Sequence, residues 1–162
     1  MWQELLTLWS SIRDPEYAYL LLESLPLYGL GAGLLFLLVS HLAGEKKSKL
    51  LALGLICTSC LSVWPAQDLR ERAAPRVIAT RDATLAPLIR TQTERRAKSA
   101  WAYLTLAVLS GVTLILQASG KGKMPLLLTA LASIALFWFS IWLHKKECEV
   151  YHRNIVKYRP PR

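Results

Sequence analysis

The stretch MPLLLTALASIALFWFSIWL, from Met124 to Leu143, contains no ionisable side chain. At 1.5 Å per residue, a helix of about 20 apolar residues crosses the ~30 Å hydrocarbon core of a lipid bilayer. No polar stripe interrupts the segment, as it would in an amphipathic helix of a soluble protein. The segment 124–143 is therefore predicted to be a transmembrane helix.

Three further apolar blocks precede it, at 24–43, 50–65 and 100–118, and most charged residues lie between the blocks. The block at 50–65 is short for a bilayer, so we expect local thinning of the membrane or shielding by neighbouring protein. The pattern predicts an all-α fold, a four-helix transmembrane bundle that forms a single integral membrane domain over residues 1–162.

Helical character also extends outside the four blocks. Trp2, Leu5 and Trp9 recur at helical spacing, which predicts an N-terminal helix lying in the membrane interface. The link 66–100 contains two helical stretches, and the second is expected to continue into the third span. We expect this link to form a helical cytoplasmic loop.

The 20 Lys and Arg residues divide unequally between the two sides of such a bundle. Fifteen lie on the side that holds both termini and the link 66–100, and five lie in the two opposite turns. The positive-inside rule therefore predicts that the termini and this link face the cytoplasm. Anionic lipid headgroups at the cytoplasmic face account for the basic charge, so lipids are expected partners and nucleic acid is not.

Gly29 and Gly33 form a GxxxG motif in the first span. Small residues at this spacing let two helix backbones approach closely within a membrane. The motif is predicted to be a helix-packing site, against either another span of this chain or another subunit.

The chain has three histidines, His41, His144 and His152. A haem held by two histidines needs both imidazoles at one membrane depth on facing helices. His41 ends the first span and His144 ends the fourth, on opposite sides of the membrane, so the two cannot hold one iron. Either residue could supply a single axial ligand to a cofactor shared with a partner, but a polar cap at the lipid boundary is the preferred interpretation of His41. No cofactor is predicted for the chain by itself.

The three cysteines are Cys57, Cys60 and Cys148. The pair Cys57 and Cys60 forms a CxxC near mid-span, where a thiolate is poorly solvated, so we interpret it as structural. His144, Cys148 and His152 follow one helix face but extend over about 12 Å, which is too far for one metal ion. No metal site is predicted.

The sequence contains no phosphate-binding loop and no serine nucleophile elbow, and its acidic residues are interpreted as scattered among basic ones on a solvated face. We therefore expect no enzymatic activity. The predicted function is a non-catalytic integral membrane subunit that packs against and stabilises a larger bacterial membrane complex, respiratory or photosynthetic. Its partners would be other integral membrane subunits. The alternative is a haem- or quinone-linked electron-transfer membrane protein.

Four short motifs resemble a family of small bacterial four-helix membrane proteins of unknown function. The motifs are PLYGL (26–30), SVWP (62–65), AAPRV (73–77) and TERRA (93–97). The resemblance covers about residues 20–145 and implies the same four-span architecture, in a bacterial inner membrane.

Members of that family often carry a histidine before the first span and a His-Glu-like pair before the third. This chain has Ser24 and Leu25 at the first position and Thr93 at the second. If those histidines bind a cofactor in relatives, the resemblance implies that this chain has lost it. The resemblance therefore supports an architecture more than an activity.

Overall fold

The computed structural model describes residues 13–80, 83–121 and 123–151. The predicted interfacial helix at the N-terminus lies outside these ranges. Every regular element among the described residues is helical. The elements are α2 (Pro15–Glu23), α3 (Leu25–Leu42), α4 (Lys46–Leu61), α5 (Val63–Thr80), the short 3-10 helix η1 (Ala83–Leu85), α6 (Ala86–Ala118) and α7 (Lys123–Tyr151).

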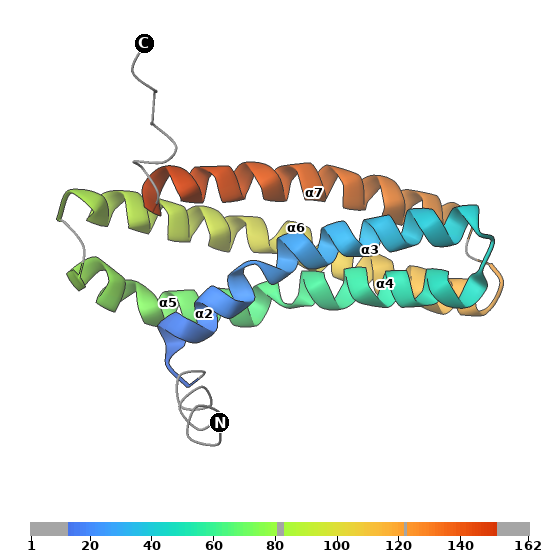
Figure 1. Cartoon of the computed structure of the whole chain (residues 1–162), viewed down its shortest axis with the longest axis horizontal. Coiled ribbons are helices and arrows are strands. Elements are labelled where there is room, and N and C mark those ends of the chain that lie inside the picture. The colour runs from blue at the N-terminus through green and yellow to red at the C-terminus, as the bar shows by residue number, and fades with distance from the viewer. Residues whose placement is uncertain (1–12, 81–82, 122, 152–162) are drawn as a thin grey trace, which may run out of the picture.

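The helices form four long antiparallel rods: α2 with α3, α4 with α5, α6, and α7 (Figure 1). Each rod is long and apolar enough to cross a membrane. This confirms the predicted all-α four-helix bundle, and it is consistent with a multi-pass membrane protein. The rods contain 28 to 35 residues, so they are about 42–52 Å long, which exceeds the ~30 Å thickness of a hydrocarbon core.

The rods pack in a ring, in which α4 contacts α3 and α6, and α7 contacts α6 and α3. The contact between α3 and α7 is the least extensive of these four. Leu30, Leu53, Ile56 and Leu106 lie fully or almost fully buried in the centre of the ring. Apolar side chains from successive rods therefore form one continuous core.

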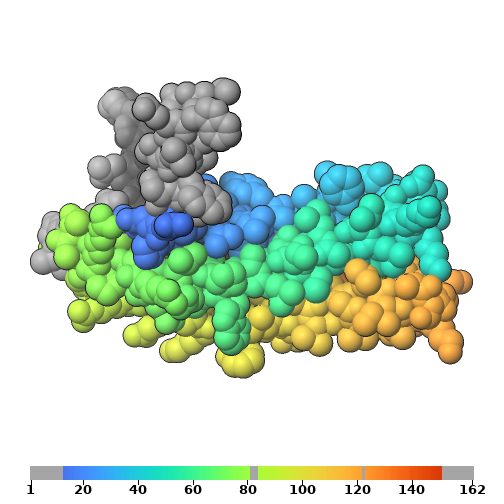
Figure 2. All heavy atoms as spheres, turned by 90° about the horizontal axis from the view of Figure 1, so that it is seen from below, coloured from blue at the N-terminus to red at the C-terminus, as the bar shows by residue number. Residues whose placement is uncertain are grey.

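Proline bends the first two rods. Pro26 lies in the first turn of α3, where its missing N–H ends α2 at Glu23, and Ser24 joins the two helices. Pro65 follows the corresponding break between α4 and α5 at Ser62. In Figure 2 the atoms of α2 lie directly against those of α5.

The apolar block 50–65, predicted as a short second span, lies within a longer rod. That rod runs from Lys46 to Thr80, because α5 continues beyond the bend through the first part of the link 66–100. The expectation that the second part of the link continues into the third span is confirmed, since α6 runs unbroken from Ala86 to Ala118.

Two tight turns close the end of the bundle opposite α2. Gly44 and Gly120 follow the C-termini of α3 and α6 with φ of 74° and 80°, the left-handed conformation that favours glycine after a helix. Lys46 Nζ donates to the carbonyl of Ala118 across 2.9 Å and joins the two turns.

Asp14 fixes the other end of the first rod. Its carboxylate accepts from the N–H of Glu16 at 2.9 Å, which caps α2 with Pro15 in the first turn. Arg76 Nη1 donates to the same carboxylate at 2.8 Å, and this contact holds the pKa of Asp14 below its usual value. The cap therefore also joins α2 to α5.

Candidate functional site

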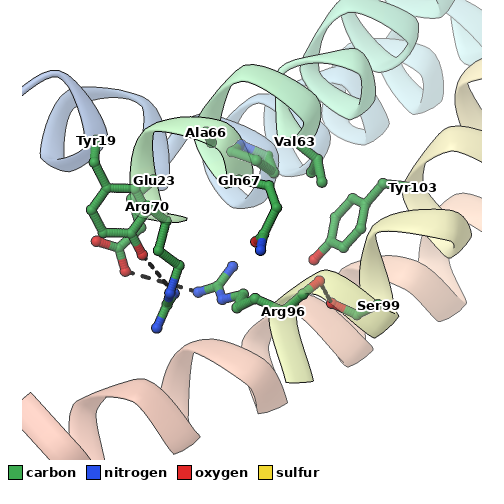
Figure 3. A pocket seen from close by; sticks show the side chains of 10 residues that line it. Tyr19, Glu23, Val63, Ala66, Gln67, Arg70, Arg96, Ser99 and Tyr103 are labelled. Atoms are coloured by element: carbon green, nitrogen blue, oxygen red, sulfur yellow. Dashed lines mark hydrogen bonds and ion pairs between the residues drawn. The ribbon is translucent and has the colours of Figure 1, made fainter. Parts of the chain in front are cut away.

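Polar side chains from all four rods meet in one place, beside the bends at Ser24 and Ser62. We name this group the ionic cluster. It comprises Tyr19 and Glu23 of α2, Arg70 of α5, Arg96 of α6 and Glu147 of α7. Figure 3 shows four of these side chains pointing toward one another: Tyr19, Glu23, Arg70 and Arg96.

Glu147 is the centre of the ionic cluster. Its carboxylate forms ion pairs with Arg70 and with Arg96 and accepts a third hydrogen bond, at 3.0 Å, from the hydroxyl of Tyr19. Arg70 and Glu147 are each only 4% exposed. A buried carboxylate is stabilised when charged donors surround it in this way.

The remaining contacts extend the cluster across the helices. Arg70 Nη1 donates to the hydroxyl of Tyr19 at 2.7 Å, and its Nε donates to the hydroxyl of Thr93 at 3.2 Å. Arg96 lies 3.9 Å from the carboxylate of Glu23. Two acidic and two basic side chains are thus matched in number.

The cavity beside the ionic cluster is small. It has a volume of about 20 Å³ and is lined by residues that include Tyr19, Gln67 and Tyr103 (Figure 3). A space of this size holds about one water molecule. The cluster therefore has no room for a substrate in this conformation.

Glu23, His144 and Glu147 each offer a ligand atom, and these three atoms lie within 4.8 Å of one another. This set could in principle hold a metal ion. However, Arg70 and Arg96 already form ion pairs with Glu147, and Arg96 also lies near Glu23. A cation placed there would meet two guanidinium groups at short range, so the geometry favours the ion pairs.

The interpretation of the acidic residues as a solvated, scattered set is wrong for Glu23 and Glu147. Both are at least half-buried and take part in the same cluster. A signal for this was present in the sequence. Glu23, Arg70, Arg96 and Glu147 each lie within five residues of a predicted span end, on the same side of the membrane. They are therefore expected at the same depth in the membrane, and two of them are acidic and two are basic.

The two histidines proposed as axial ligands lie at opposite ends of the bundle. His41 is exposed near the end of α3, in the groove that also contains Lys123. His144 lies 21 residues beyond Lys123 on α7, which is about 31 Å along the helix. Its Nε2 lies 3.7 Å from Cys148 Sγ. The structure does not bring the two imidazoles together.

All three cysteines are free thiols in the described part of the chain. Cys60 is buried in the core, whereas Cys57 Sγ lies 3.4 Å from the carbonyl of Ala107 on α6. Cys148 is half-buried beside His144. The CxxC pair thus lies within the contact between α4 and α6.

Gly29 and Gly33 lie where α3 crosses α4. A Cβ atom added to Gly29 would lie 2.1 Å from Ser59 Oγ, and one added to Gly33 would lie 2.6 Å from Ile56 Cγ1. Neither distance leaves room for a methyl group. The GxxxG motif therefore faces another span of the same chain.

Hydroxyl groups join α6 to α7 inside the apolar part of the bundle. The hydroxyls of Tyr103 and Ser140 lie 2.6 Å apart, and those of Thr113 and Thr129 lie 2.8 Å apart. All four residues are buried. Such pairs stabilise helix contacts where no water is present to compete.

Two apolar grooves lie on the outer surface that the described residues form. One, of about 520 Å³, lies between α6 and α7 and is lined by small residues that include Ala102, Ala132 and Ala135. The other, of about 470 Å³, lies between α3 and α7 and is lined mainly by leucines. Both grooves open to the outside of the bundle, so their walls contact the surrounding lipid or protein.

No family model matches the chain, and comparison with curated proteins and with solved structures finds no match either. The resemblance to a bacterial four-helix family stays a prediction. Thr93, which stands where that resemblance expects histidine, accepts a hydrogen bond from Arg70. The position is thus occupied by a member of the polar network around the ionic cluster.

Proposed function

We propose that the chain is a non-catalytic integral membrane subunit that packs against and stabilises a larger bacterial membrane complex, respiratory or photosynthetic. The observation that carries this proposal is the closure of the ionic cluster. Its charged groups contact one another, and the cavity beside it holds about one water molecule. Ligand sites typically enclose about 300–1,000 Å³. A structural role for these side chains fits this geometry better than catalysis.

The outer surface supports the same proposal. Large apolar side chains such as Phe36, Leu131 and Trp138 are more than half exposed. The groove between α6 and α7 presents Ala102 and Ala135, small residues that let a neighbouring transmembrane helix approach closely. We propose a partner helix as its occupant.

We also propose that the bundle lies in a bacterial inner membrane with both termini in the cytoplasm. Fifteen of the 20 basic residues support this orientation through the positive-inside rule. Anionic headgroups at the cytoplasmic face would then neutralise exposed side chains such as Arg90 and Lys98.

The proposal is tested by the size and protein content of the particle in which the full-length chain migrates. Native membranes that contain a tagged chain are dissolved in mild detergent and separated on a native gel. We expect the chain to co-migrate with other integral membrane proteins. Ala135→Leu should release it from the complex because the added side chain fills the groove between α6 and α7. Ala130→Leu, on the same helix but in the other groove, is the matched control.

A monodisperse chain that migrates without partners would contradict the proposal, as would turnover of a substrate by the purified chain. The electron-transfer alternative predicts a Soret band in the isolated complex that His41→Ala or His144→Ala removes. Because these two residues are far apart, such a haem would need its second ligand from a partner.

A further inference from the structure

The groove between α3 and α7 has the dimensions of a site for one lipid chain. It occupies about 470 Å³ at the least extensive contact of the ring, and its walls are formed by side chains such as Leu34, Leu38 and Leu127. This volume lies within the range of about 300–1,000 Å³ that is usual for ligand sites. An apolar groove of this size favours an apolar occupant.

The depth of the groove matches one leaflet of a bilayer. On α7 its lining begins at Lys123 and ends at Ile134. The two residues are eleven positions apart, which is a rise of about 16 Å, and half of the hydrocarbon core is about 15 Å thick. A chain that enters at the membrane surface would therefore reach the mid-plane at the far end of the groove.

The mouth of the groove carries basic and polar groups. His41 of α3 and Lys123 of α7 line it at the end of the bundle that holds the two turns. Lys46, Lys47 and Lys121 are exposed at the same end. None of the ion pairs among the described residues involves Lys123.

Acidic charge is scarce around this mouth. Among residues 42–49 and 119–123, Glu45 is the one acidic side chain. Its Oε2 accepts a hydrogen bond from the hydroxyl of Ser48 at 2.6 Å. The mouth thus favours a negatively charged headgroup.

We infer that this groove binds an anionic phospholipid, with one acyl chain between α3 and α7 and the phosphate beside Lys123 and His41. The inference depends on the groove alone and not on the proposed role in a complex. It differs from general attraction to anionic membranes because it assigns one lipid to one place.

The test uses the full-length protein in an uncharged detergent, titrated separately with phosphatidylglycerol, phosphatidylcholine and glycerol phosphate. Native mass spectrometry counts the bound molecules. We expect phosphatidylglycerol to be retained in preference to phosphatidylcholine, and glycerol phosphate, which has no acyl chain, not to be retained. Lys123→Gln should weaken phosphatidylglycerol binding about fivefold, the usual contribution of one basic residue at a membrane surface.

Ala130→Phe fills the groove and should reduce the binding of both phospholipids. Lys47→Gln and Ala135→Phe are matched controls, since they alter the same end of the bundle and the same helix outside this groove. Lys123 is exposed, so Lys123→Gln keeps the test valid even if Ala130→Phe disturbs folding. Equal retention of the two phospholipids by the unmodified chain, or unchanged phosphatidylglycerol binding in Lys123→Gln, would overturn the inference.

Discussion

Arg70 and Glu147 lie 77 residues apart in the chain and form an ion pair in which each side chain is at most 5% exposed. Arg70 comes from the second rod and Glu147 from the fourth. Arg96 of the third rod and Tyr19 of the first bind the same carboxylate. One side chain therefore joins all four rods.

Glu147→Gln should be among the most destabilising single changes in the bundle. It leaves two guanidinium groups close together without the carboxylate between them, and breaking a buried ion pair in this way costs about 3–5 kcal/mol. Arg70→Met should cost less, because Arg96 still pairs with Glu147. Reversible unfolding in mixed micelles that contain SDS measures both.

Arg72→Gln is the matched control for these variants. Arg72 lies on the same helix as Arg70 but is 65% exposed, and it pairs with Asp68 one turn away. Exposed pairs contribute about 0–1 kcal/mol. Equal destabilisation by Arg72→Gln and Glu147→Gln would show that the ionic cluster contributes no special stability.

Gly33→Ala should destabilise the bundle by about 1–3 kcal/mol, the usual cost of overpacking a core. The added methyl group would lie 2.6 Å from Ile56 Cγ1 and 3.3 Å from its backbone nitrogen. Gly54→Ala is the control, because its nearest contact would be Leu114 Cδ1 at 3.8 Å. It should be neutral or slightly stabilising, and the same unfolding assay compares the two.

Thr129→Val and Ser133→Ala should have different effects, although both remove a buried hydroxyl from one face of α7. Thr129 pairs with Thr113, so its loss should cost about 0.6–1.7 kcal/mol. The hydroxyl of Ser133 has no hydrogen-bond partner among the described residues. Its removal should be neutral or stabilising. A larger loss of unfolding free energy for Ser133→Ala would contradict this account.

Asp14→Ala should loosen α2 without unfolding the bundle, because it removes both the helix cap and the contact with Arg76. Hydrogen exchange should accelerate in residues 15–23. The pKa of Asp14 is lowered by this contact, so the protection is present at neutral pH and is lost as the pH falls through that lowered pKa. Asp68→Ala, which removes another exposed ion pair, should leave exchange in α2 unchanged.

Single cysteines test the proposed orientation. In a chain whose own cysteines are replaced by alanine, Lys121→Cys should react with a membrane-impermeant maleimide in whole cells. Arg72→Cys should react only after the cells are opened. The opposite pattern would invert the orientation, and labelling of both sites in whole cells would contradict a spanning bundle.

The four rods could be predicted from the sequence because apolar composition over about 20 residues is a strong local signal. The apolar blocks 24–43 and 100–118 lie in the rods that contain α3 and α6. The continuation of α4 into α5 was harder to predict. Its residues after Ser62 are polar on one face, and their burial depends on α2, which is distant in the chain.

The ionic cluster was missed for a different reason. Each of its charged residues resembles a surface residue when its own segment is read alone. The sequence places Glu23, Arg70, Arg96 and Glu147 near span ends on one side of the membrane, but the pairing of the rods is needed to show that they meet. The packing glycines were easier to predict, because the GxxxG motif can be recognised from the sequence of one helix. The motif does not say which helix is the partner.

The position of the ionic cluster along the rods limits how deeply the bundle can sink into a bilayer. The rods shield the paired charges of the cluster itself, but exposed side chains at the same end, such as Arg72 and Arg76, would enter the hydrocarbon with it, at a cost of several kcal/mol. The opposite end carries exposed lysines, so both ends of the bundle carry charged groups that resist entry into hydrocarbon. Such a protein would favour membrane regions whose hydrocarbon thickness matches the distance between these two charged ends. It would locally thin or thicken a bilayer that does not match.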